Sequence, residues 1–89
     1  MEHLGNTATL IIGESTGVAV AWELTKLGVK GAFIIDGIGL WEGKDEPAVM
    51  AKVDGLTNLA QAFGIAEGLR IAFKQQSVLL VWNATAYLV

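Results

Sequence analysis

Residues 29–43 read Val-Lys-Gly-Ala-Phe-Ile-Ile-Asp-Gly-Ile-Gly-Leu-Trp-Glu-Gly. Branched and aromatic side chains run up to the aspartate, which is typical of a strand. The segment Asp36-Gly37-Ile38-Gly39 follows, and it favours a tight turn because aspartate bonds its own backbone and glycine adopts positive φ. Leu40-Trp41-Glu42 then returns as a second strand. The stretch therefore predicts a β-hairpin that pairs 30–35 with 39–43.

The segment before this hairpin predicts a strand followed by a helix. Residues 8–12 form a short apolar run that ends at Gly13. Apolar residues then recur at helical spacing, and Ser15 or Thr16 precedes them as a possible N-cap. Gly28 suits the left-handed residue that ends a helix. We therefore expect a strand over 8–12 and a helix over 16–27.

The segment after the hairpin predicts a long helix and then three strands. Pro47 suits a first helical turn, and an apolar stripe follows at spacings of four and three residues: Val49, Val53, Leu56, Ala60 and Phe63. We expect this helix over 47–67, ending near Gly68, and strands within 69–89. The predicted fold is a single α+β domain over residues 1–89, with an antiparallel sheet of about five strands packed against two helices. An α/β Rossmann-like half is the alternative.

Composition excludes several functions. The 89 residues include no cysteine and one histidine, His3, so thiol chemistry, a disulfide scaffold and a histidine-rich metal site are not expected. A net charge of -3 argues against nucleic acid. Hydrophobic residues make up 53% and charged residues 17%, an apolar excess that favours self-association. No apolar run is long enough to insert in a membrane and no leader is evident, so we expect a soluble cytoplasmic protein.

A partial nucleotide-binding pattern lies at the first strand and helix. Gly13 and Gly17 flank the loop between them, and Asp36 ends the next strand, where an acid could bind ribose hydroxyls. The loop lacks a middle glycine, and Glu14 places a negative charge where phosphate would lie. Residues 8–37 nevertheless resemble the start of the ThiF-like ubiquitin-activating enzymes. That resemblance implies a nucleotide-binding Rossmann-like fragment, which we retain as the alternative function.

Other polar and aromatic residues receive structural interpretations. Glu42, Asp45 and Glu46 are interpreted as solvated residues that cap the expected helix, because acid–base catalysis needs a desolvated carboxyl group. The three tryptophans, Trp22, Trp41 and Trp82, are interpreted as core or interface residues. We therefore expect no catalytic residue, metal ligand or cofactor.

A second resemblance covers more of the chain. Gly28-Val29-Lys30-Gly31-Ala32 leads into the hairpin, and the expected long helix and three-stranded segment follow. In this order the chain resembles the Roadblock / dynein light chain family. The resemblance implies a non-catalytic homodimeric module that binds or regulates a small Ras-like GTPase. It places the dimer interface at Val53, Leu56, Ala60, Phe63, Ile71 and Phe73.

Overall fold

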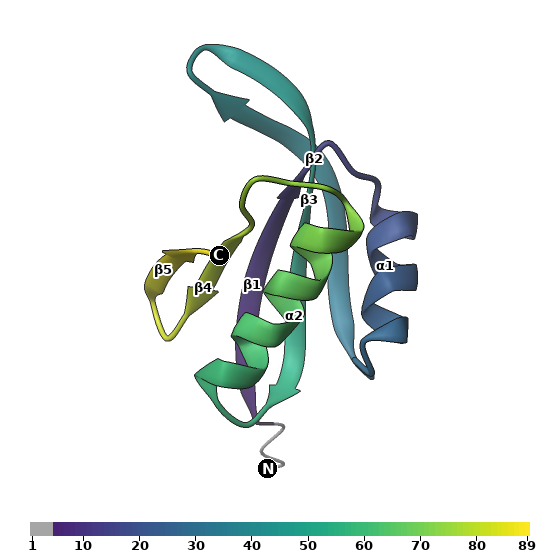
Figure 1. Ribbon diagram of the computed structural model, residues 1–89, viewed down its shortest axis with the longest axis vertical. Coiled ribbons are helices and arrows are strands. Elements are labelled where there is room, and N and C mark those ends of the chain that lie inside the picture. The colour runs from purple at the N-terminus through teal and green to yellow at the C-terminus, as the bar shows by residue number, and fades with distance from the viewer. Residues whose placement is uncertain (1–4) are drawn as a thin grey trace.

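The computed structural model describes residues 5–89, so His3 lies outside the described part (Figure 1). The elements are β1 (Asn6–Gly13), α1 (Gly17–Lys26), β2 (Ala32–Trp41), β3 (Lys44–Leu56), α2 (Leu59–Ala72), β4 (Leu79–Trp82) and β5 (Thr85–Leu88). The five strands form one sheet in the order β2-β3-β1-β4-β5, and every neighbouring pair is antiparallel. The predicted α+β class is confirmed. The Rossmann-like alternative is wrong, because β1 lies between β3 and β4 and does not pair with β2.

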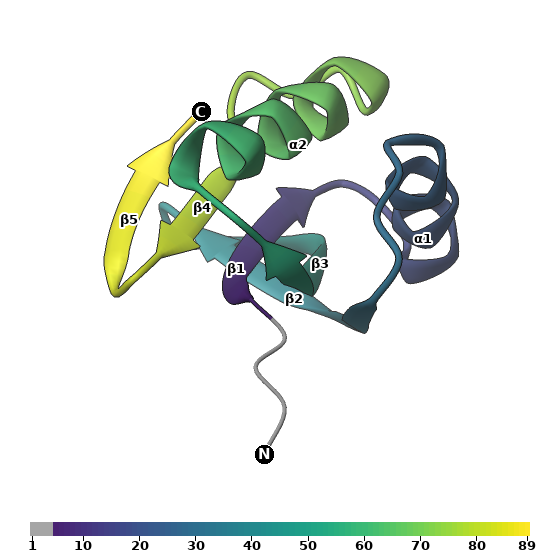
Figure 2. The same ribbon diagram turned by 90° about the horizontal axis from the view of Figure 1, so that it is seen from below.

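Both helices cover the same face of the sheet (Figure 2). Alternate strand residues point under the helices and are buried, among them Leu10, Ile12, Val49, Val53 and Leu80. The helices contribute Val20, Leu24 and Leu69 to this core. The neighbouring residues of each strand point to the opposite face, which neither α1 nor α2 covers. We call this the helix-free face.

The predicted helix over 47–67 is wrong in its first half. Residues 44–56 form β3, in which Val49, Ala51 and Val53 are buried at every second position. Gly55 has φ 80, and Asn58 then caps α2 by accepting a hydrogen bond from the Gln61 amide. The helix continues through Ala72, so the strand expected to begin at residue 69 is also wrong. The strands at 8–12 and 78–82 and the helix over 16–27 are confirmed.

The predicted hairpin forms with a different turn. β2 continues straight through Asp36-Gly37-Ile38-Gly39, and the chain reverses at Glu42 and Gly43, which have φ 50 and 78. β1 ends at Gly13 opposite Ala48, so no third strand pairs with residues 38–47. We call residues 38–47 the arm. It extends beyond the sheet and bends over it at the top of Figure 1. Within residues 5–89 neither helix is long and apolar enough to span a membrane.

Candidate functional site

A cleft of about 680 Å³ lies between the arm and the loop that joins α2 to β4. Its lining comes from parts of the chain that are far apart in sequence: the end of β1, the arm with the adjoining Ala48, residues 74–77, and the facing residues Leu79 of β4 and Leu88 of β5. Alternation along the strands places Ile11, Ala48 and Leu79 on the helix-free face. The cleft is therefore an extension of the helix-free face that the arm encloses on one side.

The floor of the cleft holds two side-chain oxygens above Gly13. A Cβ atom at Gly13 would lie 2.7 Å from Oε1 of Glu46 and 3.5 Å from Oε1 of Gln75, so glycine leaves the space that these oxygens occupy. The Gln75 amide Nε2 donates a hydrogen bond to the Phe73 carbonyl at 3.2 Å, which orients its oxygen. Glu46 is half-buried, and its carboxylate makes no hydrogen bond within residues 5–89. The floor therefore presents acceptors for a positively charged or hydrogen-bond-donating ligand.

The charges that line the cleft form no ion pair within residues 5–89. Glu14 and Glu46 are the acidic lining residues and Lys74 is the basic one. In the described part of the chain, ion pairs join Glu23 to Lys26 and Glu67 to Arg70 on the two helices, and none involves the three lining charges. The side-chain hydrogen bond with Arg70 lowers the pKa of Glu67, but this pair lies outside the cleft. The cleft thus carries an excess of negative charge that is available to a ligand.

Two lining residues have an unusual backbone. Glu14 has φ 51 and Lys74 has φ 54, in the left-handed region that non-glycine residues rarely adopt. The Glu14 amide donates a hydrogen bond to the Pro47 carbonyl at 2.8 Å, which ties the end of β1 to the arm. This bond fixes the acidic side of the cleft against the arm.

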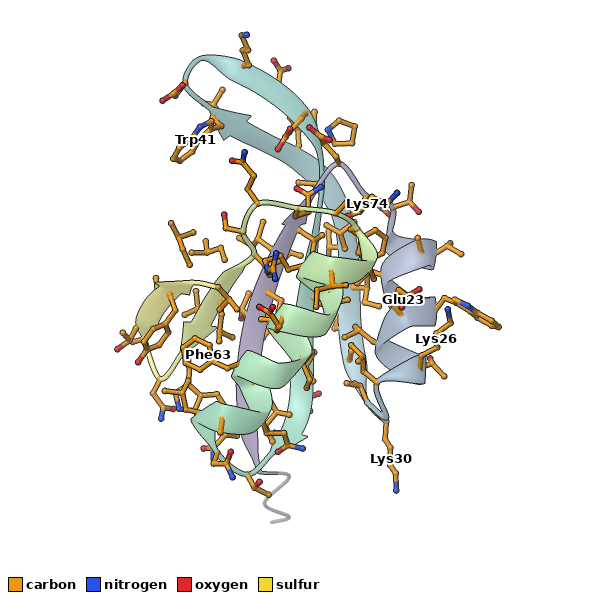
Figure 3. The ribbon with its side chains drawn as sticks, in the orientation of Figure 1. Glu23, Lys26, Lys30, Trp41, Phe63 and Lys74 are labelled. Carbon is orange, nitrogen blue, oxygen red and sulfur yellow. The ribbon has the colours of Figure 1, made fainter. Side chains whose placement is uncertain are left out.

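The arm supplies an apolar wall. Trp41 is 72% exposed and Leu40 is 74% exposed, and both line the cleft. Figure 3 shows Trp41 on the arm and Lys74 at the upper end of α2. Exposed aromatic side chains beside a cleft are typical of ligand-binding sites. The indole gives the cleft a flat surface on which a planar ring can stack.

The residues of the partial nucleotide-binding pattern do not form a phosphate site. Asp36 accepts a hydrogen bond from the Gly17 amide at 2.7 Å, at the N-terminus of α1. A Cβ atom at Gly17 would lie 2.6 Å from Oδ2 of Asp36, so the carboxylate occupies the space that glycine leaves. Asp36 therefore completes the start of a helix and is not free to bind ribose. Gly13 belongs to the cleft floor instead.

The predicted interface residues lie in different environments. Val53 and Leu56 are buried in the core under the helices, so they do not reach a partner. Phe63 and Phe73 are half-buried, and the Phe63 ring packs edge-on against Tyr87 at 5.2 Å. Ala60 and Ile71 are exposed on α2. These two are the members of the predicted set that an interface could use directly.

The interpretation of Glu46 as a solvated cap is wrong, because it is half-buried on the cleft floor and precedes a strand residue, not a helix. Glu42 and Asp45 are exposed as expected. Trp82 is a core residue as interpreted, whereas Trp41 lines the cleft. The sequence signal that could have located the site is the loop 74–77, whose polar residues Lys-Gln-Gln-Ser follow an apolar helix and precede an apolar strand.

The order of elements β1-α1-β2-β3-α2-β4, with β1 and β3 central, defines the ferredoxin-like class of α+β folds. No family model and no curated protein matches the sequence. Solved structures do match. A phage SAM lyase without ligand aligns with TM-score 0.76 at 20% identity, over 100% of this chain and 94% of the other.

Two further structures extend the comparison. The phage SAM lyase in complex with S-methyl-5'-thioadenosine aligns with TM-score 0.63 at 19% identity, over 100% of this chain and 94% of the other. CPII, a nitrogen regulatory PII-like protein from Thiomonas intermedia K12 bound to ADP, AMP and bicarbonate, aligns with TM-score 0.58 at 15% identity, over 94% of this chain and 88% of the other. At these identities the likeness establishes the fold.

These matches correct the two resemblances drawn from the sequence. Structures that share the fold include a SAM lyase and a PII-like protein, so the Roadblock and ThiF-like assignments are wrong. The GTPase-regulating function and the Rossmann-like nucleotide-binding function, which were implied by those assignments, are wrong with them. The expectation that the chain is not an enzyme is also contradicted, since two of the matched structures are of an enzyme.

Proposed function

We propose that this protein is a SAM lyase, which binds S-adenosylmethionine (SAM) in the cleft and releases S-methyl-5'-thioadenosine. The single observation that supports this most strongly is the cleft itself. It combines an exposed indole with unpaired carboxylates, in a fold of the same extent as the phage SAM lyase. The indole suits an adenine ring, and carboxylates suit the sulfonium and ammonium groups of SAM.

The sign of the charge favours SAM over a nucleoside phosphate. Glu14 and Glu46 outnumber Lys74 in the lining, and the whole chain carries a net charge of -3. SAM is a cation, whereas ADP and AMP carry negative phosphates that these carboxylates would repel. The adenine nucleotides bound by the PII-like protein are therefore poorer candidates here.

The reaction follows from the bond that must break. When the bond between the sulfonium sulfur and the γ-carbon of the methionyl part breaks, sulfur keeps the electron pair and becomes the neutral thioether of methylthioadenosine. A lyase adds no water, so the γ-carbon must bond to the substrate's own carboxylate oxygen, or the β-carbon must lose a proton. In either case the cleft has to hold the flexible amino-acid end close to the sulfonium group.

The proposal is tested by incubating the purified protein with SAM and measuring the products by liquid chromatography with mass spectrometry. We expect more methylthioadenosine than in a protein-free control. The control is needed because SAM also decays without protein. The two possible second products, a lactone and an unsaturated amino acid, are isomers of equal mass, so their chromatographic retention against authentic standards separates ring closure from proton loss. Calorimetric titrations with SAM, methylthioadenosine, ADP and AMP should show binding of the first two. Saturable binding of ADP or AMP without any binding of SAM would contradict the proposal.

Self-association, inferred from the apolar composition, stays a prediction. Ile71 is 62% exposed on α2, and an interface there would bury it. We expect Ile71→Asp to dissociate such an assembly with little change in Tm, because a carboxylate buried at an interface loses its hydration. Sedimentation of the wild type and the variant measures this, and a wild type that sediments as one chain at micromolar concentration contradicts it. The predicted cytoplasmic location is likewise untested.

A further inference from the structure

The two helices of this protein end with the same hydrogen-bond pattern. At the end of α1, the Gly28 amide donates to the Thr25 carbonyl at 3.1 Å and the Val29 amide donates to the Leu24 carbonyl at 3.0 Å. At the end of α2, the Lys74 amide donates to the Ile71 carbonyl at 3.2 Å and the Gln75 amide donates to the Arg70 carbonyl at 2.9 Å. Both ends require one residue in the left-handed region just after the C-cap.

The residue in that position differs between the two helices. It is Gly28, with φ +84, after α1, and it is Lys74, with φ 54, after α2. Glycine adopts this conformation without steric penalty, whereas a side chain with a Cβ atom destabilises it. Attraction between a cation and the helix C-terminus does not account for the lysine, because each helix already has a basic residue in its last turn, Lys26 or Arg70.

Location distinguishes the two positions. Nothing lies within 4 Å of a Cβ atom placed on Gly28, which faces open space, whereas Lys74 lines the cleft. Lys74 is the basic residue of the described lining and forms no ion pair within residues 5–89. It also adjoins Gln75, whose oxygen lies on the cleft floor with that of Glu46. The lysine therefore adopts a strained backbone conformation in a cleft where its charge has no ion-pair partner within residues 5–89.

We propose that Lys74 is a specificity residue that binds the α-carboxylate of the amino-acid end of SAM, while the carboxylates of the cleft hold the positive groups. This inference rests on the proposed function. SAM carries a carboxylate together with positive groups. Methylthioadenosine lacks the whole amino-acid end and therefore has no carboxylate. Lys74 should thus contribute to binding of SAM and not to binding of methylthioadenosine.

The test compares stability with affinity in Lys74→Gly. Removing the strained side chain should raise Tm by roughly 2–8 °C. The loss of the ammonium group should weaken SAM binding by about 10-fold and leave methylthioadenosine binding within about twofold. Lys74→Arg keeps the charge and should retain most of the SAM affinity. Lys30→Ala is the matched control. Lys30 is exposed and does not line the cleft, so this variant should change neither affinity.

The outcomes separate this inference from the proposed function. A gain in Tm with a selective loss of SAM affinity supports the role of Lys74. Equal losses of SAM and methylthioadenosine affinity, no loss of either, or no gain in Tm would overturn that role while the wild type still binds SAM. A wild type that binds neither ligand overturns the proposed function itself, whatever the variant does to Tm.

Discussion

Glu46→Gln is expected to weaken SAM binding about 10- to 150-fold and to leave methylthioadenosine binding within about twofold. The carboxylate lies half-buried on the cleft floor above Gly13 and has no partner in the described chain. Glutamine keeps its shape and removes its charge. A hydrogen bond to a charged group contributes roughly 1.5–3 kcal/mol, and SAM is a cation whereas methylthioadenosine is neutral. Calorimetric titration of both ligands measures the difference.

Asp45→Asn is the matched control for this variant. Asp45 precedes Glu46 on β3, so it points to the opposite face, and it does not line the cleft. It should change neither affinity. Neither substitution should lower Tm by more than a few degrees, because neither carboxylate is paired in the folded part described here. Equal losses of SAM affinity in both variants would show that net charge, and not the position of Glu46, controls binding.

The fold class was predictable because its decisive signals are local. The apolar run at 8–12 and the capped helical pattern of 16–27 each form the predicted element. The failure at 47–67 has a physical origin, since Val49, Val53 and Leu56 satisfy helical spacing while Val49, Ala51 and Val53 satisfy strand alternation. Pairing of β3 with both β1 and β2 decides between the two patterns, and that pairing is not local in the sequence.

A signal for the true helix start was present in the sequence. The Asn58 side chain accepts a hydrogen bond from the Gln61 amide at 2.9 Å, and Oε1 of Gln61 accepts one from the Thr57 amide at 2.9 Å. An asparagine followed three residues later by glutamine is typical of a helix N-terminus. The apolar stripe that began at Val49 outweighed it and moved the expected helix too far toward the N-terminus.

The candidate site was not predictable, because tertiary structure assembles it. Gly13, Glu46 and Gln75 are brought together by the pairing of β1 with β3 and by the return of the chain after α2. Glu46 precedes Pro47, and an acidic residue before a proline is a sequence pattern that occurs at the start of a helix. The pair alone therefore does not distinguish a helix start from the two-stranded arm. The nucleotide-binding hypothesis failed for a related reason. Asp36, which it assigned to the ribose, and Gly17, which it assigned to the phosphate loop, are hydrogen-bond partners of each other.

Trp41→Ala is expected to weaken SAM and methylthioadenosine binding to the same extent, by about 5- to 150-fold. Both ligands carry adenine, and stacking of a base on an aromatic ring contributes about 1–3 kcal/mol. Trp41 is 72% exposed on the arm, so its removal should leave Tm nearly unchanged. This pattern differs from that of Glu46→Gln and Lys74→Gly, which should affect SAM alone.

Trp22→Ala distinguishes stacking in the cleft from a general effect of tryptophan. Trp22 is 66% exposed on α1, has Lys26 Nζ 6.0 Å from its ring centroid, and does not line the cleft. Its removal should leave both affinities unchanged. We expect ligand binding to change the tryptophan fluorescence of the wild type and of Trp22→Ala, and to have no such effect in Trp41→Ala. If Trp41→Ala instead keeps full affinity for methylthioadenosine, adenine does not stack on the arm. The ligand would then have to lie against Ile11, Leu79 and Leu88, on the strands of the helix-free face.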